Sequence, residues 1–198
     1  MTIIPLSEGA FTVGKTKKFF PFNKEQDNLQ ERETGSLLVE VQPFAVVTAE
    51  DILVLDAGLG FELHGTLQIH QNLIAAGIEP SKVTKVLMSH LHKDHSGGIS
   101  KINPATGKQE LSFSNAKYYI QKQELAFAFD KGAPSYMIAD LECLNNNQQV
   151  ILLEGNGAID GYIKYELTGA HCPYHQVFWI IDGGEEIFYG GDETHPSN

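Results

Sequence analysis

Three histidines and an aspartate lie within six residues, His90-Leu91-His92-Lys93-Asp94-His95, directly after the apolar run 83–88. The run predicts a buried strand, and the end of a strand holds the following loop in place while its side chains still reach solvent. Neutral imidazole nitrogens and carboxylate oxygens suit a borderline divalent ion such as zinc. The sequence therefore predicts a metal site built on the end of a strand.

Composition narrows the class of protein. The 198 residues are 42% hydrophobic and 20% charged, which is typical of one globular domain with a sizeable core. The formal net charge of −11 argues against a nucleic-acid partner. No apolar run is long enough to span a membrane and the N-terminal residues lack the order of a signal peptide, so we expect a cytoplasmic protein with no membrane partner. Cys143 and Cys172 are too few for a disulfide framework and are expected to be reduced thiols.

Strand and helix patterns alternate along the chain, which predicts an α/β fold. The first three strands are expected to form an antiparallel meander over 36–42, 45–48 and 52–56. Residues 102–114, with their Asn-Pro and Thr-Gly pairs, are expected to form a surface excursion. Helices are expected over 65–76 and 121–129, and further strands over 83–88, 117–120, 149–154, 162–167, 176–182 and 186–189, the last two joined by a hairpin turn.

Two remote segments each add a candidate metal ligand. His171 lies in the loop 168–175 between two predicted strands, and Asp192 lies in Tyr189-Gly190-Gly191-Asp192, just past another. The small residues beside them let the backbone come close to a metal and its ligands.

These segments together resemble the metallo-β-lactamase-fold hydrolase superfamily. Residues 89–98 match its H-x-H-x-D-H signature, and the segment 55–58, the Gly-x-His loop at His171 and the Gly-Asp at Asp192 follow in family order. The resemblance implies a four-layered αββα sandwich, an α/β (α+β) fold that forms one domain over 1–198, with the metals in a cleft along the edge of two sheets. It implies two divalent ions, zinc in most branches and iron or manganese in others, and it points towards the lactonase-like branch.

The resemblance also assigns roles by position. It implies a first metal held by His90, His92 and His171, a second held by Asp94 and His95, and a bridge between them from Asp192. Asp56 would organise the ligand loop through hydrogen bonds without touching metal. The implied mechanism is hydrolytic: a metal-bridging hydroxide attacks a carbonyl or phosphoryl centre, the ions stabilise the oxyanion, and Asp94 and Asp192 orient the hydroxide, one of them carrying the proton to the leaving group.

The sequence departs from the family at its end. The family supplies a last histidine to the second metal from a segment well beyond the position of Asp192, whereas this sequence stops at Asn198. We expect a C-terminally truncated form of a longer protein, because the second sheet would otherwise keep an exposed edge and an uncovered apolar face. The alternatives are His195 as a substitute ligand, and one firmly held metal beside a weakly held one.

Three nearby residues need separate interpretations. Lactone-hydrolysing members often have a tyrosine three residues after the bridging aspartate, where this sequence has His195. His195 is therefore a candidate substrate-facing acid, and the alternative is a terminal residue with no role. We expect His175 to be a structural residue packed below its loop and Cys172 to be a small buried residue, neither of them a ligand.

The expected function is a metal-dependent hydrolase that cleaves a small ester, lactone, thioester or amide. Three alternatives stay open: a phosphodiesterase or nuclease of the same fold, against which the acidic balance counts; an iron-dependent dioxygenase-type member; and a metal-binding protein without catalytic activity.

Basic and aromatic residues are combined in the stretch 12–22, ahead of the first predicted strand. We expect an ordinary surface loop or a homodimer contact whose aromatic rings pack on the sandwich. The alternative is an arm that folds over the cleft and supplies apolar walls and a positive charge for a carboxylate or an acyl chain.

Overall fold

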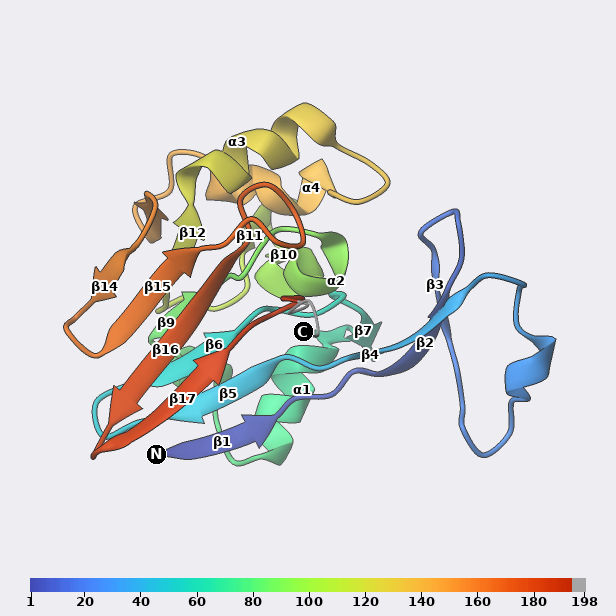
Figure 1. Ribbon diagram of the computed structural model, residues 1–198, viewed down its shortest axis with the longest axis horizontal. Helices are drawn as coiled ribbons and strands as arrows, with labels where there is room; N and C mark the ends of the chain where they lie inside the picture. Colours follow the sequence, from blue (N-terminus) through green and yellow to red (C-terminus); the bar gives the residue numbers. More distant parts are fainter. Residues whose placement is uncertain (194–198) are drawn as a thin grey trace.

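Two β-sheets face each other in the computed structural model, which describes residues 1–193 (Figure 1). The larger sheet has the strand order β1-β5-β6-β9-β12-β13, and its strands are β1 (Thr2–Pro5), β5 (Phe44–Val47), β6 (Ile52–Leu55), β9 (Lys85–Leu87), β12 (Lys117–Gln121) and β13 (Val150–Leu153). The smaller sheet is antiparallel and consists of β14 (Gly157–Ile159), β15 (Ile163–Leu167), β16 (Gln176–Asp182) and β17 (Glu185–Tyr189).

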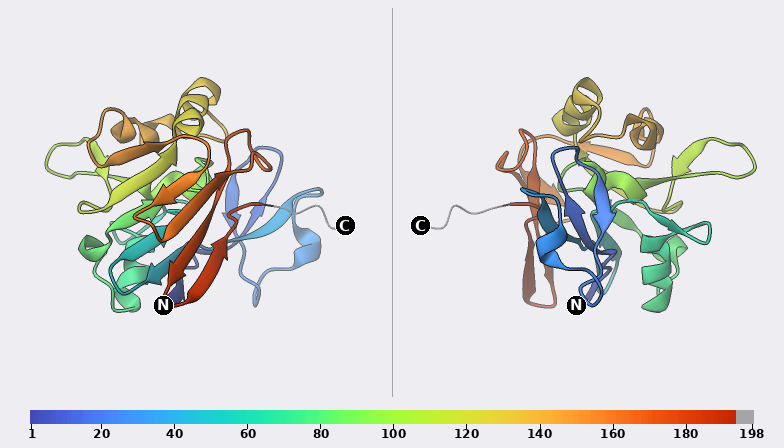
Figure 2. Two further views of the ribbon diagram at one scale, coloured as in Figure 1. Left: turned by 60° about the vertical axis from the view of Figure 1, so that its left-hand side comes forward. Right: turned by 90° about the vertical axis from the view of Figure 1, so that its right-hand side faces the viewer.

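Side chains that alternate along the central strands create two cores. In β6, Leu53 and Leu55 face the smaller sheet and pack with Phe178 and Ile180, whereas Val54 faces the helices on the other side. The helical layer contains α1 (Gln68–Ala75), α3 (Lys122–Lys131) and α4 (Ile138–Leu141). Within residues 1–193, no helix covers the outer face of the smaller sheet (Figure 2). The described chain is thus layered as helix, sheet and sheet.

A two-stranded ribbon carries the larger sheet outward into an arm, which we define as residues 9–41. β1 pairs with β5, and β2 (Gly9–Val13) pairs with β4 (Leu37–Val41) directly beyond it. The N–H groups of Leu6 and Glu8 donate to Pro43 O and Val41 O, both at 2.8 Å, and so bridge the gap between the two pairs. β3 (Phe19–Pro21) completes a three-stranded sheet in the order β3-β2-β4. Figures 1 and 2 show this arm beside the ends of the two facing sheets.

The expected meander is wrong in its first strand. β5 and β6 form the antiparallel pair that was predicted, but β4 belongs to the sheet of the arm and pairs with β2. The physical reason is that Gln42 and Pro43 continue the chain from one sheet into the next without reversing it, so β4 cannot fold back on β5 (Figure 1).

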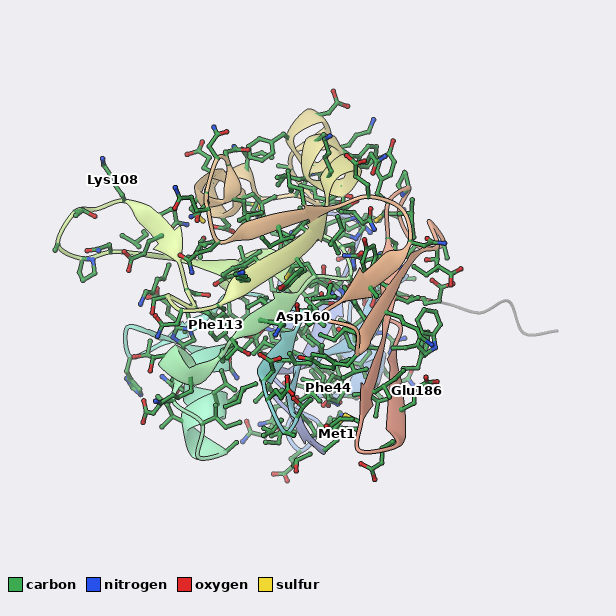
Figure 3. All side chains as sticks on the ribbon, turned by 90° about the vertical axis from the view of Figure 1, so that its left-hand side faces the viewer. Met1, Phe44, Lys108, Phe113, Asp160 and Glu186 are labelled. Carbon is green, nitrogen blue, oxygen red and sulfur yellow. The ribbon has the colours of Figure 1, made fainter. Side chains whose placement is uncertain are left out.

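Most other expected elements are confirmed within a few residues. The helix predicted over 65–76 is shorter, because the short strands β7 (Glu62–Leu63) and β8 (Thr66–Leu67) precede it. The excursion at 102–114 is the loop and second strand of a hairpin formed by β10 (Ser100–Ile102) and β11 (Gln109–Leu111), with Lys108 near its tip (Figure 3). The remaining helical pieces are α2 (Lys93–Ser96) and the 3₁₀ turns Leu29–Glu31, Pro80–Lys82, Gly97–Ile99 and Glu142–Leu144. No helix of the described residues is long and apolar enough to cross a membrane.

Glu8 is a buried carboxyl group at the joint between β1 and β2. It is 5% exposed, and its Oε2 accepts a hydrogen bond of 2.6 Å from the N–H of Leu59, in the loop that follows Asp56. Oε1 is buried with no hydrogen-bond partner among residues 1–193. Burial raises the pKa of Glu8 to about 7, although the bond from Leu59 opposes the shift. Glu8 therefore stays protonated to higher pH in the folded protein than in the unfolded chain.

Replacing Glu8 by glutamine should change how stability depends on pH. Because the folded-state pKa of about 7 lies above the unfolded value of 4.5, the native state of the wild type binds more protons in between and loses stability as pH rises through this window. We expect Glu8→Gln to gain about 2–3 kcal/mol relative to wild type between pH 5 and pH 8, measured by urea unfolding at fixed metal concentration. The exposed Glu62→Gln is the control, and parallel pH profiles for Glu8→Gln and wild type would contradict the assignment.

Candidate metal centre

Four loops meet at one edge of the two facing sheets, and each carries a residue expected at the site. β6 and β9 are parallel neighbours, so their carboxyl ends place Asp56 and His90 close together. The smaller sheet supplies His171 from the loop between β15 and β16, and Asp192 just after β17. The fold thus brings together residues that are far apart in the sequence.

His90, His92 and His171 form a three-histidine group. The distance from His90 Nε2 to His92 Nδ1 is 3.0 Å, and that from His92 Nδ1 to His171 Nε2 is also 3.0 Å. One ligand nitrogen of each ring lies within 4.8 Å of the other two. Burial, helped by the neighbouring histidines, lowers the pKa of His90 well below its usual range and that of His92 to about 4. Neutral imidazoles whose nitrogens converge in this way fit a divalent ion.

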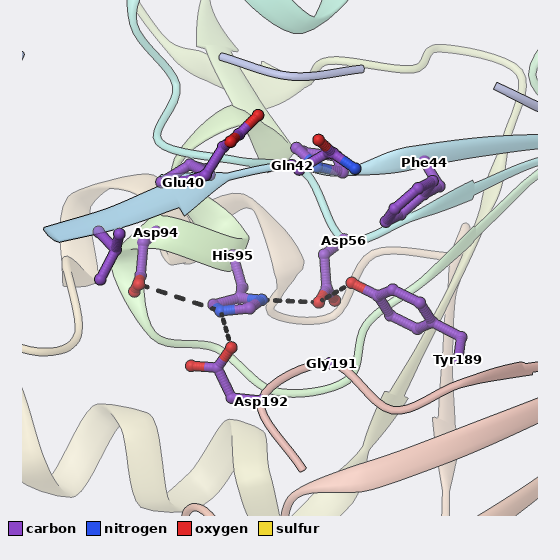
Figure 4. Close-up of a pocket in the computed structure, with 12 residues that line it drawn as sticks. Glu40, Gln42, Phe44, Asp56, Asp94, His95, Tyr189, Gly191 and Asp192 are labelled. Carbon is purple, nitrogen blue, oxygen red and sulfur yellow. Dashed lines mark hydrogen bonds and ion pairs between the residues drawn. The ribbon is translucent and has the colours of Figure 1, made fainter. Parts of the chain in front are cut away.

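Asp94, His95 and Asp192 form a second set, which we call the aspartate–histidine group. Their ligand atoms also lie within 4.8 Å of one another. His95 Nε2 is 3.3 Å from Asp192 Oδ1 and 3.9 Å from Asp94 Oδ2 (Figure 4). The other oxygen of Asp192, Oδ2, is 3.5 Å from His171 Nε2. The hydrogen bond with His95 lowers the pKa of Asp192 to about 2 against the effect of burial. An ionised Asp192 carboxylate therefore joins the aspartate–histidine group to the three-histidine group.

Asp56 contacts the aspartate–histidine group through His95 and is 1% exposed. Its Oδ1 accepts from the Ser89 N–H at 2.7 Å, and its Oδ2 lies 2.6 Å from the Ser89 hydroxyl. The same Oδ2 is 2.7 Å from the Tyr189 hydroxyl and 2.7 Å from His95 Nδ1 (Figure 4). Asp56 is also within 4.8 Å of ligand nitrogens of His90 and His95, but these four contacts already occupy its oxygens. Its geometry is that of a residue that orients the ligand loop.

The carboxylates around His95 favour a positive charge on its ring. Burial alone would lower the pKa of His95, but the negative charges of Asp56, Asp192 and Asp94 outweigh burial and raise it well above the usual range. Surrounding carboxylates that stabilise a cation on this ring would equally stabilise a bound metal cation there. The residues present thus fit a divalent ion by charge as well as by donor type.

The Metallo-beta-lactamase superfamily model matches residues 39–198. The chain belongs to this superfamily. The match covers both groups of the candidate centre, including the H-x-H-x-D-H signature at 90–95.

Curated proteins that are similar in sequence to this chain include N-acyl homoserine lactonases. AttM of Agrobacterium fabrum is 29% identical over 117 residues, which cover 54% of this chain and 39% of the relative. AiiA of Bacillus thuringiensis subsp. kurstaki is 25% identical over 156 residues, which cover 77% of this chain and 56% of the relative. The chain thus spans between 39% and 56% of the length of these two relatives.

Solved structures are similar over nearly the whole chain. A probable metal-dependent hydrolase from Staphylococcus aureus matches with a TM-score of 0.71 and 23% identity, over 96% of this chain and 72% of that one. AidC, a dizinc quorum-quenching lactonase, matches with a TM-score of 0.69 and 22% identity, over 94% of this chain and 69% of that one. These likenesses confirm the expected metallo-β-lactamase α/β fold.

His175 is buried next to the three-histidine group and does not belong to it. Its ring lies 5.2 Å from that of His90, and its Nδ1 is 3.2 Å from Thr168 Oγ1 and 3.5 Å from a Glu193 carboxylate oxygen. A Cβ atom added to Gly191 would lie 3.0 Å from His175 Nε2, so the ring packs closely against the turn that carries Asp192. This packing agrees with the structural role expected for His175. His195 lies outside the described residues.

Glu124 is a buried residue of the site that sequence reasoning did not single out. It is 1% exposed on α3, and its Oε1 accepts a hydrogen bond of 2.9 Å from the N–H of Leu91, between His90 and His92. Cys172, which is buried as expected, donates its thiol to Oε2 at 3.5 Å. Glu124 therefore joins the loop of His90 and His92 to the loop of His171. Nothing in the helical pattern of 121–129 marks this glutamate as different from a surface residue.

Two cavities lie beside the carboxylates of the candidate metal centre. The first, about 210 Å³, lies between the chain segment 39–44 and the residues Asp56, His95 and Tyr189 (Figure 4). The second, about 170 Å³, opens beside His92, His171 and Asp192 and is lined on its other side by the arm, including Lys17 and Phe19. Residues 12–21 thus belong to β2, β3 and the turn between them, so the segment 12–22 is not an ordinary surface loop. Val13, Lys17 and Phe19 line this cavity, which agrees with the alternative of an arm at the cleft. The homodimer contact stays a prediction.

Replacing Asp56 by asparagine tests the orienting role. The variant keeps the shape of the side chain but loses the negative charge beside His95 and one of the two carboxylate acceptors. We expect the zinc affinity to fall about 10–100-fold, measured by competition with a chromophoric chelator. Tyr189→Phe is the matched control, since it removes one donor and leaves the carboxylate, and it should have a smaller effect. Equal zinc affinity of Asp56→Asn and wild type would contradict this role.

Proposed function

We propose that the protein is a metal-dependent hydrolase that cleaves a small ester or lactone, with thioesters and amides as related substrates. The observation that carries the proposal is the Asp192 carboxylate, which joins the aspartate–histidine group to the three-histidine group, with one oxygen 3.3 Å from His95 and the other 3.5 Å from His171. The lactonase names of the curated relatives support the lactone as first choice. Because the chain spans only part of those relatives, their activity is a proposal for this protein.

The ligand set that we propose follows the two groups. His90, His92 and His171 would hold one ion, Asp94 and His95 a second, and Asp192 both. Zinc suits these nitrogen and oxygen donors, and the dizinc centre named for AidC agrees with it, while iron would accept the same donors. Such ions supply Lewis acidity and an activated water for attack on a carbonyl carbon.

The residues of the chain would then perform distinct steps. Asp192 and Asp94, whose carboxylates converge near His95 Nε2, would orient the attacking water by accepting hydrogen bonds from it. One of these carboxylates would pass the proton to the leaving oxygen. Asp56 would keep the His95 ring in position through its Nδ1. His195 remains a candidate proton donor to the leaving group or substitute ligand, and its role rests on sequence alone.

Replacing His92 by alanine tests metal binding and hydrolysis together. Its Nδ1 is 3.0 Å from the ligand nitrogens of both partners in the three-histidine group, so its loss should remove the ion held there. We expect about one equivalent of zinc to be lost by elemental analysis, and kcat/KM for a γ-lactone to fall by at least about 100-fold with the circular dichroism unchanged. The exposed His64→Ala serves as the control.

Two outcomes would decide against these assignments. Full metal content in His92→Ala would overturn the three-histidine group as a ligand set. Failure of the metal-loaded wild type on lactones, esters and thioesters would overturn the hydrolase proposal, and turnover of a phosphodiester alone would favour the phosphodiesterase alternative.

A further inference from the structure

The 170 Å³ cavity beside the candidate metal centre is lined by apolar side chains, by two lysines and by residues of the centre itself. Apolar side chains come from β2, β3 and β4: Val13, Phe19, Leu37 and Val39. Lys17 and Lys93 add two ammonium groups, the first from the turn between β2 and β3 and the second from the start of α2. His92, His171 and Asp192 lie at the side of the metal centre. A ligand in this cavity would meet carbon surface, positive charge and the reacting site together.

The fold holds both lysines at the cavity. Lys17 has a left-handed φ of 57°, and its N–H donates to Gly14 O at 3.0 Å, which fixes the turn that carries it. Lys93 Nζ lies 5.6 Å from the ring centroid of Phe19, an arrangement in which the aromatic face attracts the ammonium group. Phe19 in turn packs against the buried Phe11, with ring centroids 6.1 Å apart. The arm thus brings a basic turn next to a residue of the ligand loop.

Neither ammonium group has a carboxylate within 4.0 Å in the described part of the chain. By contrast, Lys85 pairs with Asp51 and Asp160, and Lys122 with Glu154. The carboxylates nearest in the cavity, Asp94 and Asp192, are directed at His95 and His171.

The lack of an ion pair does not by itself distinguish these two lysines, because Lys15, Lys18 and Lys164 also have none within 4.0 Å among residues 1–193. Lys17 and Lys93 differ from them in that both line one cavity beside the candidate metal centre. Two cations at one cavity repel one another, and an anion bound there would relieve this repulsion.

We propose that this cavity binds a substrate whose acyl or ring substituent ends in a carboxylate, separate from the bond that is cleaved, and that Lys17 and Lys93 recognise that carboxylate. The apolar residues Val13, Phe19 and Val39 would contact the intervening carbon chain. A carboxylate has one oxygen for each ammonium group, and the two acidic side chains that also line the cavity, Asp94 and Asp192, disfavour the second negative charge that a phosphate would bring. The inference rests on the proposed function and specifies its substrate class.

A matched pair of substrates tests the inference. One is a γ-lactone whose ring bears a short alkyl chain ending in a carboxylate, and the other is the same lactone with a primary carboxamide in place of the carboxylate. For the zinc-loaded wild type we expect kcat/KM to be at least about fivefold higher for the carboxylate, and this preference to shrink as salt is raised. In Lys17→Met/Lys93→Met the ratio should fall to about one, and Lys17→Arg should retain it.

Lys18→Met provides the matched control, because Lys18 is exposed on the same turn and is not among the residues that line the cavity. It should keep the wild-type preference. Metal content is measured for every variant, so that a loss of zinc in the Lys93 variant is recognised. A wild-type ratio of one, or a preference that survives the double substitution, would overturn the inference.

A binding measurement separates this inference from the hydrolase proposal. The tetrahydrofuran analogues of the two lactones lack the carbonyl group and cannot be hydrolysed. Calorimetry on the zinc-loaded protein should give at least about fivefold tighter binding of the carboxylate analogue, and the double variant should lose the difference. If neither lactone is turned over but this preference is present, the choice of a lactone as substrate fails and the cavity assignment stands. Equal affinity for the two analogues would overturn the cavity assignment.

Discussion

The buried Asp56 carboxylate is the interaction on which the geometry of the metal centre depends. A charged group that is 1% exposed is costly unless hydrogen bonds and opposite charge compensate for its desolvation. Here the partners are the N–H and hydroxyl of Ser89, the His95 ring and the Tyr189 hydroxyl. These donors come from the end of β9, from α2 and from β17, so one carboxylate ties the ligand loop to both sheets. Removing it would leave several ligand-bearing segments without a common anchor.

Two further polar residues, Gln176 and Glu124, stabilise the same edge of the sheets. Gln176, the first residue of β16, donates its backbone N–H to Ser89 O at 2.9 Å and its side-chain amide to Met88 O at 2.7 Å. Glu124 accepts the Leu91 N–H from the opposite side and contacts the Cys172 thiol. The chain before His92 is thus fixed at Met88, Ser89 and Leu91 by groups from the smaller sheet and from α3. A site needs this kind of support, because small displacements of ligands weaken both metal binding and catalysis.

The candidate ligands could be selected from the sequence because their signal is local or has a distinctive spacing. His90, His92, Asp94 and His95 occupy one short segment, and the glycines near His171 and Asp192 mark strand ends. The structure brings these six residues into two adjoining groups. Glu124 could not have been found in the same way, because its role depends on α3 packing against a loop 33 residues earlier in the sequence. Burial of a glutamate in a helix is decided by tertiary packing, which the helical period does not reveal.

The arm shows the same limit for a whole segment. Three strands in succession suggested a meander, since adjacent strands in sequence usually pair, but β4 pairs with β2 across a separation that includes β3 and a 3₁₀ turn. This non-local pairing makes the arm an extension of the larger sheet, so Lys17 and Phe19 stand on a hydrogen-bonded framework. The candidate ligands lie in the H-x-H-x-D-H signature and at two strand ends, whereas the cavity wall opposite them is formed by the arm. Differences in substrate among chains with the same ligands are therefore to be sought in segments such as 9–41, where the pairing of strands decides which side chains face the centre.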